Sequence, residues 1–178
     1  IFCGSHAGRG ETYRTAAAQF AREVARRGLT IVYGGGNVGL MGVVADAALS
    51  AGGRVVGVLP RFMVEREVGH AGLSELHYVD SMHERKAKIA DLSDAFVALP
   101  GGLGTFDELF EALTLVQTQK ITTFPIVLLG SRYWSGLVDW LRETVMAEGK
   151  ISEADLAMIT VTDNVDLAVR MMVEASRH

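Results

Sequence analysis

The sequence predicts an α/β protein: one Rossmann-like domain over residues 1–178, with a doubly wound, mostly parallel sheet and helices on both faces. Segments with strand-like and helix-like patterning alternate along the whole chain. The near-continuous apolar runs VVGVL, AFVAL and PIVLL are typical of strands that are covered on both faces. A length of 178 residues suits one domain, and no repeat, linker or low-complexity tract divides it.

The first half of the chain is expected to contain four strands and three helices. The predicted strands are residues 1–4, 29–33, 55–59 and 76–79. The first predicted helix has apolar residues at helical spacing, namely Ala17, Phe20, Ala21, Val24 and Ala25, and Gly28 ends it. The other two predicted helices are residues 40–51 and 81–92. Pro60 is expected to end the third strand.

The second half repeats the alternation. The predicted strands are residues 95–99, 126–129 and 158–161, and the predicted helices are residues 105–119 and 134–147. A final helix is expected to reach Ala175, with Asp163 as its N-terminal cap.

Composition excludes several classes of function. The net charge is -4 with no run of like charges, which argues against a duplex nucleic acid partner. No apolar run reaches the roughly 18 residues of a membrane-spanning helix. The one cysteine, Cys3, cannot form an intrachain disulfide, which fits a reducing, cytoplasmic environment. Its position in a predicted strand favours a buried core residue over a nucleophile. The chain begins at Ile1 rather than at Met.

Three predicted strands end in loops of small residues. These loops are Gly4-Ser5, residues 34–39 (GGGNVG) and residues 100–105 (PGGLGT). Each loop alone is explained by ordinary turn chemistry. In a parallel sheet, however, ligands bind beyond the carboxyl ends of the strands, and a glycine-rich turn that opens a helix directs N–H groups at an anion. The three loops together predict a binding site for a phosphate ester.

A nicotinamide cofactor fits the same loops less well. Gly34, Gly36 and Gly39 match the dinucleotide fingerprint G-x-G-x-x-G between a strand and a helix. In that motif a carboxylate near the end of the next strand holds the ribose. Here Pro60 and Arg61 follow that strand, so the acidic residue is missing.

The helix predicted from Ser81 begins with a capping box of the form S-x-x-E, completed by Glu84. Arg85 then falls on an otherwise apolar stripe, and we expect its guanidinium to point inward. A buried guanidinium needs a partner, either in a structural salt bridge or in an anionic ligand. Lys86 faces either solvent or the ligand.

Glu108 has two interpretations from its motif alone. Thr105 and Glu108 have the T-x-x-E form of a second capping box, in which Glu108 would only close a helix N-terminus. Alternatively, Glu108 is a carboxylate held beside a bound phosphate ester.

Motifs for other chemistry are missing. The five histidines, His6, His70, His77, His83 and His178, have no metal-binding spacing, so no metal site is expected. The sequence contains neither a G-x-S-x-G nucleophile elbow nor a G-x₄-G-K-[ST] phosphate loop.

At this point the sequence resembles the LOG family of cytokinin-activating phosphoribohydrolases. Residues 100–108 (PGGLGTFDE) match the family motif PGGxGTxxE, and residues 82–86 (MHERK) match its companion motif. Residues 3–5 and 33–42 also look like family segments, so the similarity covers essentially the whole chain. Members are often labelled lysine decarboxylases, but nothing in this sequence indicates a pyridoxal phosphate enzyme. His6, Asn37 and Phe106-Asp107 depart from common family residues and leave the base specificity open.

The resemblance implies hydrolysis of the N-glycosidic bond of N6-substituted AMP, or of AMP itself, to the free base and ribose 5-phosphate, without a cofactor. Arg85 and Glu108 would be the catalytic pair. The predicted substrate-binding residues are Ser5, Gly35, Gly36, Asn37, Glu67, Met82, Lys86, Gly101, Gly102, Leu103, Gly104, Thr105, Asp107 and Thr114.

The chemistry is consistent with those roles. Cleavage of a ribosyl–purine bond develops oxocarbenium charge, which a carboxylate stabilises directly or by activating water. Glu67 or Asp107 is a candidate second carboxylate. The resemblance also implies a homodimer or a higher homo-oligomer. The alternative function is a non-catalytic carrier of a phosphorylated cofactor, as in the molybdenum-cofactor carriers that resemble this fold.

Overall fold

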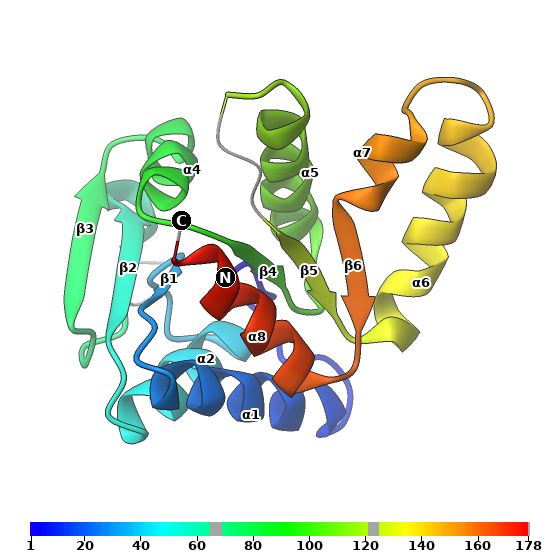
Figure 1. The fold of residues 1–178 in the computed structure, drawn as a ribbon. Helices are drawn as coiled ribbons and strands as arrows, with labels where there is room; N and C mark the ends of the chain where they lie inside the picture. The colour runs from blue at the N-terminus through cyan, green and yellow to red at the C-terminus, as the bar shows by residue number, and fades with distance from the viewer. Residues whose placement is uncertain (65–68, 121–124, 178) are drawn as a thin grey trace.

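Two parallel three-stranded sheets form the centre of the protein, in a computed structural model that describes residues 1–64, 69–120 and 125–177 (Figure 1). The first sheet has the order β1-β2-β3 and the second has the order β4-β5-β6. Their bounds are β1 (Ile31–Tyr33), β2 (Val55–Pro60), β3 (Glu75–Val79), β4 (Phe96–Ala98), β5 (Ile126–Leu129) and β6 (Ile159–Thr162). All strand pairs are parallel, which confirms the predicted α/β class.

The N-terminal segment lies between the two sheets. Phe2 forms a parallel bridge with Ala98: its N–H donates to the carbonyl of Val97 and its own carbonyl accepts from Leu99, both at 2.9 Å. On the other side, the amino group of Ile1 donates to the carbonyl of Val32 at 2.6 Å. The predicted strand 1–4 is thus a one-residue bridge rather than a strand, although it occupies the place of one.

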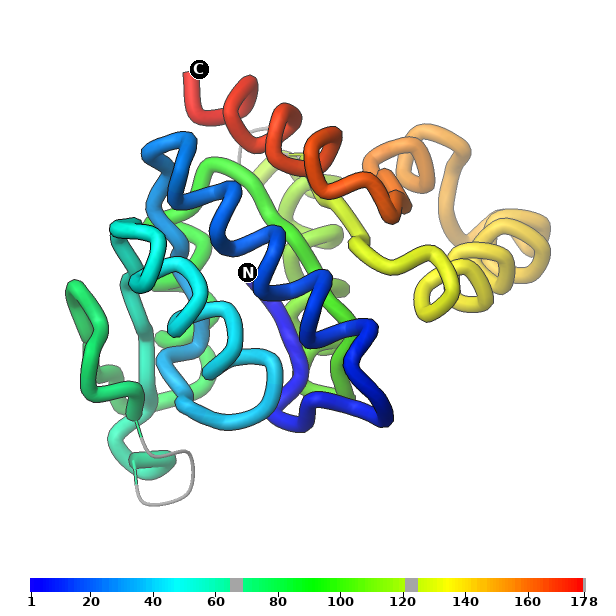
Figure 2. The backbone as a smooth tube through the Cα atoms, turned by 90° about the horizontal axis from the view of Figure 1, so that it is seen from below, coloured from blue at the N-terminus to red at the C-terminus, as the bar shows by residue number. Residues whose placement is uncertain are grey.

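Alternate residues of each strand point to opposite faces of the sheet, and helices cover both of these apolar faces. One core contains Ile31, Tyr33 and Val97 and is covered by α1 (Thr12–Arg26), α2 (Gly39–Ser50) and α8 (Val165–Ala175). The other contains Val32 and Phe96 and is covered by α4 (Met82–Asp91), α5 (Leu103–Gln117) and α6 (Ser131–Trp140). Figure 2 shows α1 running between α2 and α8. The helices within the described residues are too short or too polar to cross a membrane.

Three local expectations need correction. The helix predicted over residues 134–147 is α6 followed by a π-helical turn, η2 (Leu141–Met146), and two short helices, η1 (Arg61–Met63) and α7 (Glu153–Ala157), were not predicted. Asp163 does not cap the last helix, because Asn164 does so by accepting from the N–H of Leu167 at 3.0 Å. Asp163 instead accepts from the N–H of Ser131 at the start of α6, at 2.8 Å.

Candidate functional site

The three glycine-bearing loops lie together at the carboxyl edge of the strands. Gly4 connects the other two: its carbonyl accepts from the N–H of Leu40 at 3.0 Å, and its N–H donates to the carbonyl of Pro100 at 3.2 Å. A Cβ at Gly39, where φ is +59°, would lie 2.3 Å from the main chain of Ser5. This close approach requires glycine at position 39.

Arg85 is buried on the first turn of α4, as its position on the apolar stripe predicts. Its side chain is only 5% exposed. Nη2 donates to the carbonyl of Gly34 at 2.7 Å and Nε donates to the carbonyl of Val58 at 3.1 Å. The guanidinium therefore holds main-chain groups just after β1 and within β2. A Cβ on Gly34 would lie 2.0 Å from Nη2, so this contact also requires glycine.

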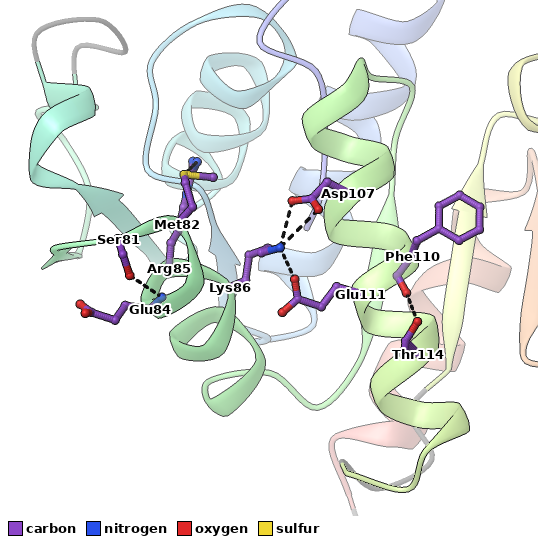
Figure 3. Close-up of polar contacts among 9 residues, drawn as sticks. All are labelled: Ser81, Met82, Glu84, Arg85, Lys86, Asp107, Phe110, Glu111 and Thr114. Atoms are coloured by element: carbon purple, nitrogen blue, oxygen red, sulfur yellow. Dashed lines mark hydrogen bonds and ion pairs between the residues drawn. The ribbon is translucent and has the colours of Figure 1, made fainter.

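The capping box predicted for Ser81 and Glu84 at the start of α4 is confirmed in part. Ser81 is the N-cap and accepts from the N–H of Glu84 at 3.1 Å. The Glu84 carboxylate returns to the N–H of Asp80 at 2.9 Å, one residue before the cap. This cap fixes the start of α4, the helix that carries Arg85 and Lys86 (Figure 3).

The second predicted capping box is wrong, because α5 begins before Thr105. The N-cap is Gly102, and no side chain caps this helix. Thr105 is buried against the loop: a Cβ on Gly101 would lie 2.0 Å from its Oγ1. Glu108 consequently lies on the second turn of α5 and does not close the N-terminus. The structural interpretation of Glu108 as a capping residue is thereby removed.

Glu108 lies where α5 packs beside α4. It is half-buried and borders a pocket of about 20 Å³ between α4 and α5, whose other lining residues include Lys86, Glu111 and Phe2. A space of this size holds about one water molecule. The space between α4 and α5 is thus too small for a ligand much larger than a water molecule.

Arg85 and Glu108 both act electrostatically on the same buried thiol. Burial, the largest cause, raises the pKa of Cys3 to about 12; the negative charge of Glu108 also raises it, and the positive charge of Arg85 lowers it. Both charged groups therefore lie within electrostatic range of Cys3. The thiol remains protonated at neutral pH, so Cys3 is a core residue and not a nucleophile.

Lys86 forms a charged cluster with Asp107 and Glu111 of α5 (Figure 3). Its Nζ lies 3.0 Å from Asp107 Oδ2 and also pairs with Glu111, and its side chain is only 13% exposed. The hydrogen bond to Glu111 is the main reason why the pKa of Lys86 is raised. The cluster links α4 to α5, the two helices that carry Arg85 and Glu108. Sequence reasoning missed Glu111, although it follows Asp107 at the i, i+4 spacing of one helix face.

Other predicted contact residues line the loop edge. A Cβ on Gly102 or Gly104 would meet nothing within 4 Å, and Leu103 between them is 87% exposed. Packing within the chain does not explain these two glycines, whereas close approach of a ligand would. Met82 contacts Arg85, with its sulfur 3.9 Å from Nη1.

The structure does not place two of the predicted substrate-binding residues at the loop edge. Thr114 lies roughly 16 Å along the α5 axis from Leu103. Its hydroxyl donates to the carbonyl of Phe110 at 2.7 Å, one turn earlier on the same helix (Figure 3). Glu67 lies outside the described residues.

A pocket of about 220 Å³ opens at the opposite edge, where its lining includes Leu29, Thr30 and Ala95. These residues precede β1 and β4, whereas parallel sheets bind ligands beyond the strand ends. Within residues 1–64, 69–120 and 125–177, no group of three His, Cys, Asp or Glu side chains could hold a metal ion.

Comparisons with known proteins show which family the chain belongs to. A family model described as possible lysine decarboxylase matches residues 41–172. The cytokinin riboside 5′-monophosphate phosphoribohydrolase of Rhodococcoides fascians is 44% identical over 171 residues, covering 95% of this chain and 85% of that protein. The phosphoribohydrolase LOG2 of Arabidopsis thaliana is 37% identical over 175 residues, covering 98% and 81%.

Solved structures with the same architecture include the molybdenum cofactor carrier protein of Chlamydomonas reinhardtii. It superposes with a TM-score of 0.69 at 20% sequence identity, covering 100% of this chain and 94% of that one. Likeness at this level of identity shows the fold alone.

Proposed function

Because the chain belongs to the LOG family, whose family model bears the description possible lysine decarboxylase, we propose that it is an N-glycosidase of nucleoside 5′-monophosphates. It hydrolyses the bond between ribose and base in N6-substituted AMP, or in AMP, and releases the free base and ribose 5-phosphate. The observation that carries this proposal is the placement of Arg85 and Glu108. Arg85 holds the Gly34 carbonyl of one glycine loop, and Glu108, on the neighbouring helix α5, lies within electrostatic range of Cys3, which adjoins Gly4 of another.

The phosphate anchor is proposed at the starts of α2 and α5. Both helices begin at this edge, with Val38 and Gly102 as N-caps, and neither start has a side-chain cap. Helix N-termini of this kind present N–H groups and a positive dipole end to an anion. The open space at Gly102 and Gly104 lets a phosphate ester approach the main chain.

The proposed reaction uses the carboxylate of Glu108. As the bond to the base breaks, positive charge develops on the ribose, and Glu108 stabilises it or deprotonates the attacking water. Asp107 forms an ion pair with Lys86 beside the site. Arg85 orients the glycine loop through the Gly34 carbonyl, and hence the ribose phosphate.

The lysine decarboxylase description implies pyridoxal phosphate, and Lys86 does not fit that cofactor. A lysine that forms a Schiff base must lose its proton, which a lowered pKa favours. Lys86 is paired with two carboxylates, and the hydrogen bond to Glu111 raises its pKa.

Turnover is expected to require the 5′-phosphate. The glycine-rich helix starts recognise an anion, so adenosine forgoes that binding energy and should react at least about 10²-fold more slowly in kcat/KM than AMP. Release of adenine from both compounds, followed by chromatography, measures this ratio. Similar kcat/KM for adenosine and AMP would contradict the proposed phosphate anchor.

Activity is expected to survive treatment with EDTA. The proposed chemistry relies on Glu108 and Arg85, and the described acidic and histidine side chains form no metal-binding group. Initial rates with AMP are compared before and after chelation and dialysis. A loss of activity that Mg²⁺ or Zn²⁺ restores would show that the reaction needs a metal.

We also propose that the protein forms a homodimer or a higher homo-oligomer. The outer face of α5 has apolar surface, since Phe110 is 38% exposed and Leu103 is 87% exposed. Light scattering at micromolar concentration should give at least twice the mass of one chain. Phe110→Glu, which places charge on that face, should lower the mass to that of one chain. A monomeric wild-type protein would contradict the proposal.

A further inference from the structure

The main chain of the glycine loop, residues 34–36, is held at three consecutive carbonyl oxygens. The carbonyl of Gly34 accepts from Arg85, that of Gly35 from the N–H of His70 at 3.0 Å, and that of Gly36 from the hydroxyl of Tyr33 at 3.0 Å. The described peptide bonds are all trans, so the N–H after each carbonyl points away from these donors. The anchors therefore set the direction of the N–H groups that an anion would meet.

His70 is itself fixed on both sides of its ring. The residue is 9% exposed; its Nε2 lies 2.9 Å from Asp46 Oδ1, and its Nδ1 accepts from the N–H of Gly72 at 3.1 Å. A carboxylate only accepts and a main-chain amide only donates. Nε2 therefore has the proton and Nδ1 has none. The contacts select one neutral tautomer and one ring orientation.

Asp46 connects this ring to the helix that follows the glycine loop. It lies on α2, which begins at Gly39. His70 thus holds the Gly35 carbonyl through its main chain and α2 through its side chain. Gly35 itself has φ +79°, and a Cβ there would press on Leu76 and Leu59, so the loop has little room to relax.

We propose that His70 and Asp46 are a pair of positioning residues for the phosphate-bearing part of the substrate. They fix the glycine loop relative to α2, so that its N–H groups are already oriented when the phosphate ester arrives. The inference rests on the proposed function, and neither residue takes part in bond cleavage. Loss of the pair should weaken binding of the phosphate-bearing part and leave the chemical step largely unchanged.

The test compares Asp46→Ala with Asp46→Asn. Alanine removes the acceptor for His70. Alanine also has a higher helix propensity than aspartate, so a rise in the measured constants cannot come from a weakened α2. The KM for AMP and the inhibition constant of ribose 5-phosphate should both rise about 3- to 10-fold, the effect of one lost hydrogen bond, while kcat stays within about twofold. Asn keeps an acceptor oxygen and should restore both constants. The inhibition constant of adenine should not change.

Two controls complete the experiment. His77 pairs with Glu75 on β3 at 2.7 Å, away from the glycine loop, so His77→Gln should leave both constants unchanged. His70→Phe should raise them, and adding Asp46→Ala to it should have no further effect, because both changes break the same contact. Additive effects in the double variant would contradict the pair.

Failure of this inference is distinguishable from failure of the proposed function. If the wild-type protein releases no base from any nucleotide, the proposed function fails, and calorimetric binding of ribose 5-phosphate to wild type and Asp46→Ala still tests the pair. Unchanged binding in Asp46→Ala, an equal loss for adenine, or no binding of ribose 5-phosphate to the wild type would overturn the inference.

Discussion

Glu108→Gln is expected to lower kcat by about 10²-fold or more, because glutamine lacks the charge that stabilises an oxocarbenium ion or activates water. The free energy of unfolding should stay within about 1 kcal/mol of wild type, since the substitution preserves size and the side chain caps no helix. AMP should still bind. Single-turnover rates, calorimetry and thermal unfolding measure the three quantities.

Glu111→Gln is the matched control for this variant. Glu111 lies on the same helix, borders the same small pocket and pairs with Lys86, which keeps Asp107 as a second partner. Its kcat should therefore remain within about threefold of wild type, as expected for loss of one partly exposed ion pair. A Glu108→Gln protein that is folded and retains near-normal kcat would end the catalytic assignment of Glu108.

Arg85→Ala is expected to abolish turnover and to weaken AMP binding. The substitution removes the donors to the Gly34 and Val58 carbonyls and leaves them in a buried place. Unpaired groups of this kind should lower the free energy of unfolding by about 2–4 kcal/mol. Loss of nucleotide binding distinguishes this variant from Glu108→Gln, which should bind normally.

Arg85→Lys keeps the charge and separates it from the geometry of the guanidinium. One ammonium cannot reproduce the fork that reaches Gly34 and Val58 together. We expect kcat/KM to fall by about 10²-fold, because the variant loses buried hydrogen bonds from a charged group. The variant should still fold. If Arg85→Lys kept the wild-type kcat/KM, positive charge alone would suffice at this position. That result would contradict the proposal that Arg85 orients the glycine loop.

Much of the fold was predictable because each central strand is apolar on both faces. The runs around Val55, Phe96 and Ile126 left few alternatives to a covered parallel sheet, and the structure confirms the order of the elements. Short elements such as α7 were missed because five residues carry no clear helical period. The inward direction of Arg85 followed from the apolar residues at helical spacing around it.

The errors arose where two residues could do the same local task. Thr105 and Glu108 matched a capping box, but Gly102 begins the helix one turn earlier. Asp163 and Asn164 are both good caps, and the tertiary contact with Ser131 decides between them. The role of His70 could not be predicted, because its partner Asp46 is distant in sequence and meets it only in the folded chain.

The most direct test of the central claim is the product balance with AMP and with N6-isopentenyl-AMP. Purified protein is incubated with each nucleotide, and base, nucleoside, ribose 5-phosphate and inorganic phosphate are quantified together. Hydrolysis of the N-glycosidic bond predicts free base and ribose 5-phosphate in equal amounts, with no nucleoside and no inorganic phosphate. Tight binding of nucleotides without any product, as expected of a carrier, or release of nucleoside with phosphate, would contradict the account.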